Sequence, residues 1–268
     1  MADSTTRIFT FNNTKMAYNV YGEGKPLIIL HGWGVSGRVM IPLARHLSNL
    51  RTCYVVDLPG FGASDEPPIP WGIDDYVDFI KAFINSEDTG PTPVDILAHS
   101  YGGRITLKLC AREQANQTID NVLITGGAGM KPRRGVRYYA KSYTAKLLKA
   151  PFALLPSRLQ EKALVWLRQT ALWKSLGSSD YQKLSGVMRE TFVKSVSEHL
   201  EAYLPKIPHD ILLLWGEDDE ATPLYQARRM EEGIKNAALV TIKEAGHYAF
   251  LDRRKKFNAI AQAYFRGE

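Results

Sequence analysis

The stretch VDILAHSYGG, residues 94–103, is the most informative part of the sequence for the fold. It begins as an apolar run, which is typical of a strand buried on both faces of a sheet, and it leads into a helix-like segment at about 102–113. Ser100 stands at the turn between the two. A sharp strand-to-helix turn exposes a serine above the sheet edge, and small neighbours two positions away let strand and helix pack closely. Here those neighbours are Ala98 and Gly102, so Ser100 is a candidate nucleophile.

Strand and helix signals alternate on both sides of this stretch. An Asn-Asn-Thr turn after residue 11 predicts that the chain opens with an antiparallel hairpin. The later alternation predicts an α/β fold with a mostly parallel central sheet and helices on both of its faces. The predicted strands are 7–13, 15–24, 26–32, 52–60, 94–100, 121–127, 211–217 and 238–247. The predicted helices are 36–50, 73–85, 102–113 and 250–265.

One interval breaks this alternation. More than eighty residues separate the strands 121–127 and 211–217, and they contain helical patterns interrupted by prolines but no convincing strand. We interpret residues 128–210 as a helical cap inserted between two late core strands. Residues 1–127 and 211–268 then form the α/β core.

Length and composition bound the class of protein. A chain of 268 residues with 45% hydrophobic and 23% charged residues has the composition of a globular protein with one sizeable core. It lacks the roughly 18 consecutive apolar residues of a membrane span, and its start lacks the apolar region of a signal peptide. Cys53 and Cys110 lie in apolar segments and suggest buried thiols rather than a disulfide or metal site. We therefore expect a cytoplasmic protein.

The net charge of +6 is unevenly distributed along the chain. Residues 128–178 contain eleven basic residues and one acidic residue, whereas the rest of the chain contains 23 basic and 27 acidic residues. Within the segment 134–149, apolar and basic side chains fall on different sides of a predicted helix. We interpret this helix as a lid whose apolar face covers a pocket. Attraction of an anionic substrate, or weak contact with an anionic membrane surface, is the alternative.

Two later segments carry candidate partners for Ser100. LLLWGEDDEATP, residues 212–223, places three acidic residues in a loop after a buried strand, and EAGHYAF, residues 244–250, ends the next strand with His247. A serine hydroxyl is a weak nucleophile until an adjacent base activates it and a third group orients that base.

These segments resemble the α/β-hydrolase fold family over nearly the whole core. The chain order Ser, Asp, His is the family's triad order. The family's acid loop has the form G-x-x-D-x-x-x-P, which Gly216, Asp219 and Pro223 fit, so Asp219 is favoured over its acidic neighbours. The resemblance implies that Ser100 is the nucleophile, His247 the general base and Asp219 the supporting acid. The motif A-H-S-Y-G departs from the family's G-x-S-x-G at its first position.

Two further segments resemble the same family. HGWG, residues 31–34, resembles its oxyanion loop, which implies that the backbone N–H groups of Trp33 and Tyr101 hold a developing oxyanion. DLPGFGAS, residues 57–64, resembles the turn after the next strand, and its implied role is to shape the rim of the site. We interpret the flanking residues His31 and His99 as loop braces. No context supports a functional role for the remaining histidines, His46, His199 and His209.

The resemblance implies acyl transfer to water. A serine at position 100 argues against epoxide opening and halide displacement, for which the family uses aspartate. HGWG also differs from the Gly-Pro-Gly-type loop of the family's C–C bond hydrolases and from the HGGPG of its proline iminopeptidases. We expect a serine hydrolase of small to medium carboxylic esters, lactones or thioesters that works through an acyl-enzyme. An acyltransferase, a C–C bond hydrolase and a non-catalytic ligand receptor remain alternatives.

The expected partners follow from this assignment. The substrate is a small ester-type molecule, and no metal ion or organic cofactor is needed. We expect no binding to nucleic acid and no stable membrane insertion. The sequence leaves the oligomeric state open.

Overall fold

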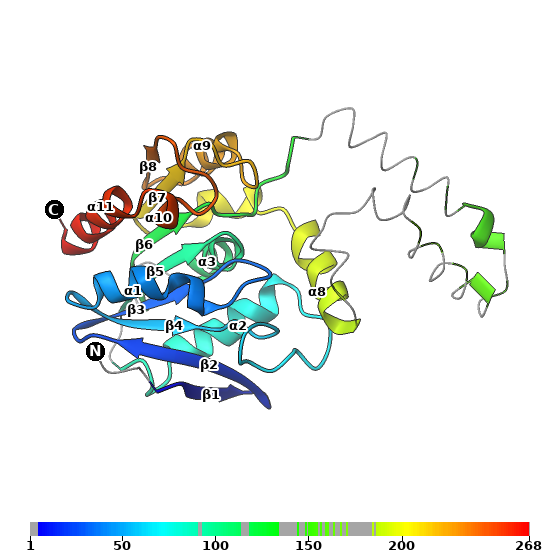
Figure 1. The fold of residues 1–268 in the computed structure, drawn as a ribbon, viewed down its shortest axis with the longest axis horizontal. Helices are drawn as coiled ribbons and strands as arrows, with labels where there is room; N and C mark the ends of the chain where they lie inside the picture. The colour runs from blue at the N-terminus through cyan, green and yellow to red at the C-terminus, as the bar shows by residue number, and fades with distance from the viewer. Residues whose placement is uncertain are drawn as a thin grey trace.

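The computed structural model describes residues 5–90, 93–113, 118–133 and 186–267. Between residues 134 and 185 it describes only residues 144, 148, 150–154, 156, 159, 160, 163, 167, 170 and 184. The described chain forms a central sheet of eight strands with helices packed against it (Figure 1). In pairing order the strands are β1 (Arg7–Phe11), β2 (Thr14–Tyr21), β4 (Arg51–Val56), β3 (Lys25–Leu30), β5 (Val94–His99), β6 (Ile119–Thr125), β7 (Ile211–Gly216) and β8 (Ala237–Ile242).

The sheet is mixed but mostly parallel, as the sequence predicts. β2 pairs antiparallel with both β1 and β4, and every other pair is parallel. The opening hairpin is confirmed. It turns through Asn12 and Asn13, whose φ angles of 47° and 60° match a two-residue turn in which both central residues are left-handed. Asparagine tolerates this conformation better than most residues, which explains the Asn-Asn pair.

Helices cover both faces of the sheet. The two apolar clusters that they form with the strands lie on opposite faces, one under α1, α10 and α11 and the other under α2, α3 and α9. Large side chains of β3, Leu27 and Ile29 against Ile28 and Leu30, alternate between the two clusters. The helices of the core are α1 (Ile41–Leu47), α2 (Ile73–Ile84), α3 (Tyr101–Arg112), α9 (Leu224–Gly233), α10 (Ala249–Asp252) and α11 (Arg254–Arg266).

The helices of the structure differ from the predictions in three places. The segment 36–50 is shorter and begins as a 3₁₀ turn, η1 (Gly37–Met40), before α1. The final helix is split into α10 and α11 at Arg253, whose ψ of 49° is not helical. Helix α9 follows the acid loop and was not predicted at all.

The segment between β6 and β7 is inserted between two neighbouring parallel strands. Its described elements are η2 (Ala150–Leu154), α8 (Gly186–Ser197) and η3 (Glu201–Lys206), and α8 lies beside the core near α2 in Figure 1. Most of the predicted basic lid helix, including Arg134, Arg137 and Lys141, lies outside the described residues. None of the helices in the described ranges is long and apolar enough to cross a membrane.

Candidate active site

Ser100 occupies a strained turn between β5 and α3. Its φ of 53° and ψ of −107° lie in a region that non-glycine residues rarely adopt. The turn is held from both sides, because Ser100 N–H donates to the carbonyl of Thr125 at 3.0 Å and Gly102 N–H donates to the carbonyl of His31 at 3.0 Å. These two hydrogen bonds therefore hold Ser100 in a backbone conformation that a serine rarely adopts.

The small residues around Ser100 have a clear steric reason. A Cβ atom on Gly102 would lie 2.7 Å from both Cβ and the carbonyl oxygen of Leu30, a distance that real Cβ contacts do not reach. Ala98 is fully buried in β5, where it pairs with Leu30 of β3 and Ile124 of β6. The departure from G-x-S-x-G at residue 98 is thus accommodated in the sheet.

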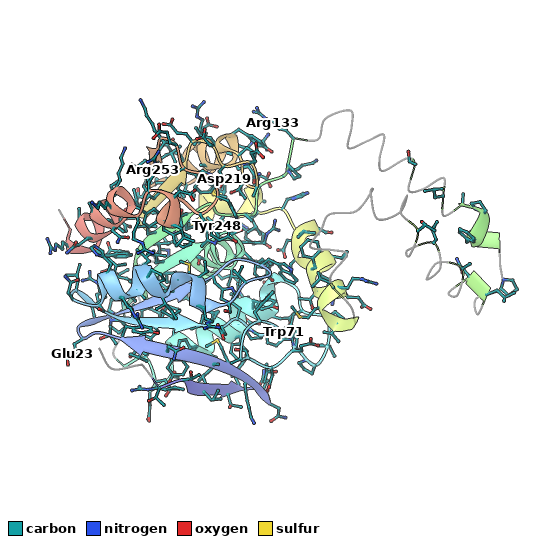
Figure 2. All side chains as sticks on the ribbon, in the orientation of Figure 1. Glu23, Trp71, Arg133, Asp219, Tyr248 and Arg253 are labelled. Carbon is teal, nitrogen blue, oxygen red and sulfur yellow. The ribbon has the colours of Figure 1, made fainter. Side chains whose placement is uncertain are left out.

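The three predicted triad residues are joined by hydrogen bonds. His247 Nε2 lies 3.0 Å from Ser100 Oγ, and His247 Nδ1 lies 2.9 Å from Asp219 Oδ2. The residues come from the segments after β5, β7 and β8, whose carboxyl ends meet at one edge of the parallel sheet. Figure 2 labels Asp219 together with Tyr248, the neighbour of His247. In this arrangement the imidazole of His247 is positioned as a base for the Ser100 hydroxyl, and the carboxylate of Asp219 is positioned to orient that imidazole.

Asp219 is the acidic residue of its loop that reaches His247. Its side chain is fully buried, whereas Asp218 and Glu220 are exposed. The backbone N–H groups of Ala221 and Thr222 donate to Asp219 Oδ1 at 2.9 and 2.8 Å. Burial alone would raise the pKa of Asp219, but the hydrogen bonds from His247 and Thr222 and the interaction with His247 lower it below its usual value. The carboxylate is therefore ionised at neutral pH.

Thr222 is a residue of this site that the sequence did not single out. Its hydroxyl lies 2.8 Å from Asp219 Oδ2, 2.9 Å from the carbonyl oxygen of Gly126 and 3.3 Å from His247 Nδ1. The hydroxyl thus contacts both the acid and the base. The signal available in the sequence was its place immediately before Pro223 in the acid loop.

His99 braces the loop that carries His247. His99 Nε2 lies 3.0 Å from the carbonyl oxygen of His247, so this nitrogen carries the proton and donates it. The two rings lie 4.7 Å apart between centroids. Burial and the neighbouring His247 lower the pKa of His99 to about 3, so its ring stays neutral.

His31 braces the loop HGWG. Its Nδ1 donates to the carbonyl of Gly32 at 2.7 Å, and its Nε2 accepts the backbone N–H of Leu58 at 3.0 Å. Burial lowers the pKa of His31 to about 4. The bonds join this loop to the turn 57–64, where Asp57 Oδ1 and Oδ2 accept the N–H groups of Gly37 and Ala63 at 2.7 and 2.8 Å.

The two predicted oxyanion donors lie side by side next to Ser100. A Cβ atom on Gly32 would lie 3.1 Å from Ser100 Cβ, so the loop that carries Trp33 runs directly against the serine. Tyr101 is the first residue of α3, where backbone N–H groups have no partner within the helix. The rings of Trp33 and Tyr101 meet edge to face, with centroids 5.0 Å apart. The assignment of their backbone N–H groups as oxyanion donors stays a prediction.

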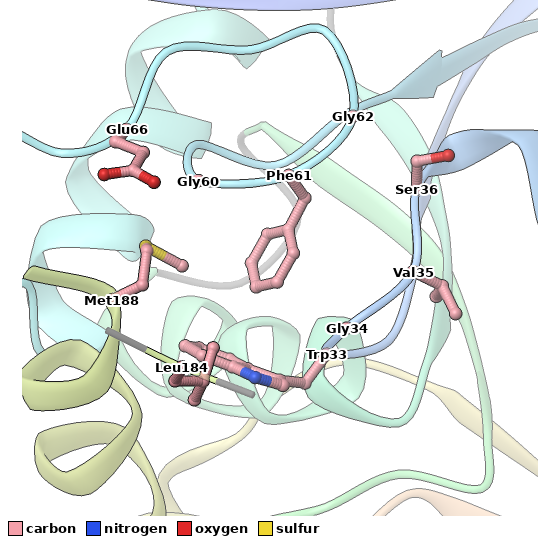
Figure 3. A pocket seen from close by; sticks show the side chains of 10 residues that line it. All are labelled: Trp33, Gly34, Val35, Ser36, Gly60, Phe61, Gly62, Glu66, Leu184 and Met188. Atoms are coloured by element: carbon pink, nitrogen blue, oxygen red, sulfur yellow. The ribbon is translucent and has the colours of Figure 1, made fainter. Parts of the chain in front are cut away.

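A pocket of about 610 Å³ opens beside Trp33 (Figure 3). The loop 33–36 and the turn 60–62 form two of its walls, and Leu184 and Met188 of the insertion form a third. Glu66 is the one charged side chain among the described lining residues, and its carboxylate points toward the side of Met188 in Figure 3. The pocket thus offers a bound molecule both polar and apolar surface, with one carboxylate among its described lining residues.

The remaining candidates lie away from this site. His46 contacts Gln262 at 3.2 Å, and His209 is buried two residues before β7 begins. Cys53 and Cys110 are free and buried, and burial raises the pKa of Cys53 to about 12. Among the described residues, no group of three or more histidine, cysteine or acidic side chains is placed to hold a metal ion.

The fold and this site define the class to which the chain belongs. Residues 25–254 match the alpha/beta hydrolase fold family, and the chain is a member of that family. It is 25% identical over 256 residues to a pimeloyl-(acyl-carrier protein) methyl ester esterase of Aliivibrio fischeri, covering 91% of this chain and 95% of the relative. It is 22% identical over 251 residues to a 2-hydroxymuconate semialdehyde hydrolase of a Pseudomonas species, covering 89% and 86%.

A solved structure has the same fold. The esterase from Exiguobacterium antarcticum superposes with a TM-score of 0.73 at 24% sequence identity, over 98% of this chain and 100% of the esterase. The chain is therefore a hydrolase of the α/β-hydrolase fold whose relatives include esterases and a C–C bond hydrolase.

Proposed function

We propose that this protein is a carboxylesterase that cleaves small to medium esters through an acyl-enzyme on Ser100. The observation that carries the proposal is the hydrogen-bonded series Ser100 Oγ, His247 Nε2, His247 Nδ1 and Asp219 Oδ2, with separations of 3.0 and 2.9 Å. Esterase activity among the relatives supports the choice of an ester as substrate. The residues assigned to the site and the extent of the cap, 128–210, are part of the same proposal.

The mechanism follows from the geometry. His247 Nε2 accepts the proton of Ser100 as Oγ attacks the ester carbonyl, and Asp219 stabilises the imidazolium that forms. The carbonyl oxygen becomes an oxyanion, which the N–H groups of Trp33 and Tyr101 stabilise. His247 then donates its proton to the leaving alcohol. Water, deprotonated by the same histidine, attacks the acyl-enzyme and releases the acid.

The lining of the pocket beside Trp33 favours a substrate whose acyl or alcohol group in this pocket carries no charge. Its described lining combines the side chains of Trp33, Phe61, Leu184 and Met188 with Ser36 and the glycines of the two loops, and Glu66 is its one charged side chain. A carboxylate on that half of the substrate would face Glu66 without a described cationic partner in the pocket lining. We therefore expect neutral acyl or alcohol groups to be preferred there.

A fluorophosphonate probe tests the nucleophile. We expect the probe to label Ser100 stoichiometrically in the wild-type protein and to leave the Ser100→Ala variant unlabelled, as read by peptide mass spectrometry. Short nitrophenyl esters should be hydrolysed by the wild type only. Absence of both labelling and turnover in the folded wild type would favour a ligand receptor and end the esterase proposal.

A substrate screen separates the competing hydrolase and transferase activities. We expect turnover of simple carboxylic esters across a series of acyl chain lengths, and slower or no cleavage of a vinylogous 1,5-diketone, the substrate type of C–C bond hydrolases. Faster release of nitrophenol on addition of an alcohol or thiol, with formation of the new ester, would instead identify an acyltransferase. Turnover of the diketone alone would identify a C–C bond hydrolase.

A further inference from the structure

We propose that helix α8 of the insertion positions the oxyanion-binding backbone, with Ser195 as a positioning residue that acts through Tyr101. The inference rests on the proposed function, since an oxyanion forms only if Ser100 attacks a carbonyl. It adds a role for the insertion that is separate from covering a pocket. Two side chains of α8, Phe192 and Ser195, contact the two residues whose N–H groups would bind the oxyanion.

Phe192 contacts the first of these residues. Its ring lies 5.1 Å from the ring of Trp33 between centroids, and Trp33 also meets Phe61 at 4.9 Å and Tyr101 at 5.0 Å. The indole is thus enclosed on three sides by aromatic rings, one of which belongs to α8. The contacts with Phe61 and Tyr101 are edge to face and that with Phe192 is tilted by 59°, and together they restrict the orientation of the indole.

Ser195 contacts the second residue through a buried hydrogen bond. Its Oγ lies 2.9 Å from the phenolic oxygen of Tyr101, and Ser195 is fully buried while Tyr101 is 4% exposed. Burial raises the pKa of Tyr101, so the phenol keeps its proton. The Tyr101 phenol also hydrogen-bonds with Tyr76 of α2, so the two bonds together constrain the ring, and loss of Ser195 removes the one that comes from α8.

The spacing of the two contacts makes them parts of one surface. Phe192 and Ser195 are three residues apart, so both project from the same face of α8. Thr191 of the adjoining turn accepts the backbone N–H of Trp71 at 3.0 Å, and Trp71 lies beside α8 in Figure 2. Movement of this face would shift Trp33 and Tyr101 together.

Hydrogen bonds and an ion pair join the carboxyl end of α8 to α3, the helix that follows Ser100. Arg104 of α3 is 6% exposed, and its guanidinium donates to the carbonyls of Ser195 and Glu198. Lys108, one turn further along α3, pairs with Glu198 and, at 2.8 Å, with Asp74 of α2. Helix α3 therefore begins with Tyr101 and also contains Arg104 and Lys108, which bind the carboxyl end of α8.

Ser195→Ala and Tyr101→Phe each remove this hydrogen bond while keeping both backbone N–H groups. Removal of an oxyanion donor costs about 100-fold or more, so a displaced donor should lower kcat about tenfold in either variant. We expect KM for a nitrophenyl ester to change less than about twofold, because ground-state binding does not use the oxyanion donors. The double variant should be no slower than either single variant, because both changes break the same bond.

The affinity for a trifluoromethyl ketone separates a positioning role from a purely structural role, because only a positioning role would change it. It forms a hemiketal oxyanion on Ser100, so its affinity should fall about tenfold in both variants, in parallel with kcat. Affinity for the corresponding secondary alcohol, which forms no oxyanion, should stay the same. Val193→Ala, at a 46% exposed position on the side of α8 away from Ser195, is the matched control and should change neither value.

The outcomes separate this inference from the proposed function. An active wild type with unchanged kcat and ketone affinity in Ser195→Ala and Tyr101→Phe would overturn the positioning role alone. Additive losses in the double variant would also overturn it, since the shared bond would then not carry the effect. A wild type that neither reacts with the fluorophosphonate nor cleaves esters would end both. Thermal unfolding of each variant shows whether the variant is folded. If Ser195→Ala is unfolded, kcat and ketone affinity of Tyr101→Phe decide the test.

Discussion

Asp218 and Asp219 are neighbours in the chain, but their side chains are in opposite environments. The carboxylate of Asp219 is buried and accepts the Nδ1–H of His247, whereas Asp218 is exposed. We expect Asp219→Asn to lower kcat for a nitrophenyl ester by about 1,000-fold or more, because an amide at this place favours the wrong tautomer of His247. Asp218→Asn is the matched control and should keep kcat within about twofold. The reverse result would transfer the role of the acid to Asp218.

Thr222 supports the same carboxylate from its other side. Thr222→Val keeps the backbone N–H that donates to Asp219 Oδ1 but removes the hydroxyl that lies 2.8 Å from Oδ2. Loss of one hydrogen bond to a charged group costs about 1.5–3 kcal/mol, part of which would appear as a fall in kcat of about tenfold. The pKa of Asp219 should also rise, since one of the bonds that lower it is gone.

Thr222→Ser provides the control for this change. It keeps the hydroxyl and should recover most of the wild-type kcat, as measured by steady-state hydrolysis of the same ester. Equal losses in the Val and Ser variants would mean that packing of the methyl group, and not the hydrogen bond, matters at this position.

At the scale of single residues, the sequence predicts the groups that the structure joins by hydrogen bonds but not the groups that support them. Ser100, Asp219 and His247 follow from motif spacing, because each lies in the segment that follows a predicted strand. Thr222 and Gly126 could not be predicted in this way. The carbonyl of Gly126 meets Thr222 only because β6 and β7 pair, and such contacts between distant segments leave no spacing in the chain.

The turn at Ser100 is the element on which the site depends most. Gly102→Ala would force a Cβ atom against the backbone of β3 at Leu30, a contact of 2.7 Å with atoms that cannot move independently. We expect the free energy of unfolding to fall by about 1–3 kcal/mol, the usual cost of overpacking, as measured by urea denaturation.

Gly72→Ala is the control for the glycine at the turn. A Cβ atom on Gly72 would meet its nearest neighbour, Asp75 Oδ2, at 3.9 Å, and the φ of Gly72 is −95°, which alanine adopts freely. Its stability should stay within about 0.5 kcal/mol of the wild type. A similar loss in both variants would mean that the contact with Leu30 is not the cause of the destabilisation.

Among the elements, long buried strands were predictable and short helices were not. The continuous apolar runs of β3, β5 and β7 are unambiguous, because both faces of these strands are covered. Helix α9 buries only Gln226, Ala227 and Met230 of its ten residues, so its apolar pattern is too weak to stand out. The break at Arg253 depends on a backbone angle, which hydrophobic periodicity does not report.

At the scale of the whole molecule, the sheet and the insertion converge on the same residues. Parallel strands bring the segments after β5, β7 and β8 to one edge, and α8 contacts Trp33 and Tyr101 at that edge. The sequence predicts the position of the insertion between two strands from the interval without strand signals. The contacts of α8 depend on tertiary packing, which a low-amplitude helical pattern such as GVMRETFVKSVS does not specify.

The buried histidines His31 and His99 should make the whole protein sensitive to acid. Their pKa values are lowered to about 4 and about 3, whereas the pKa of an unfolded histidine is about 6.5. Below pH 6.5 the unfolded chain therefore binds protons that the folded chain does not, so the stability contribution that is present above pH 6.5 is lost as the pH falls. Between pH 7 and pH 5 each histidine should reduce the free energy of unfolding by about 2 kcal/mol.

Urea unfolding at a series of pH values measures how the free energy of unfolding falls with pH. The variant His31→Gln isolates the contribution of His31 to this fall. Glutamine can donate to the carbonyl of Gly32 and accept the N–H of Leu58, the two bonds that His31 makes, but it does not titrate. The variant should therefore lose less stability than the wild type between pH 7 and pH 5, by about 2 kcal/mol. Parallel stability curves for the two proteins would mean that His31 is protonated in the folded state, and the loop HGWG would then be held by a cation instead of a neutral ring.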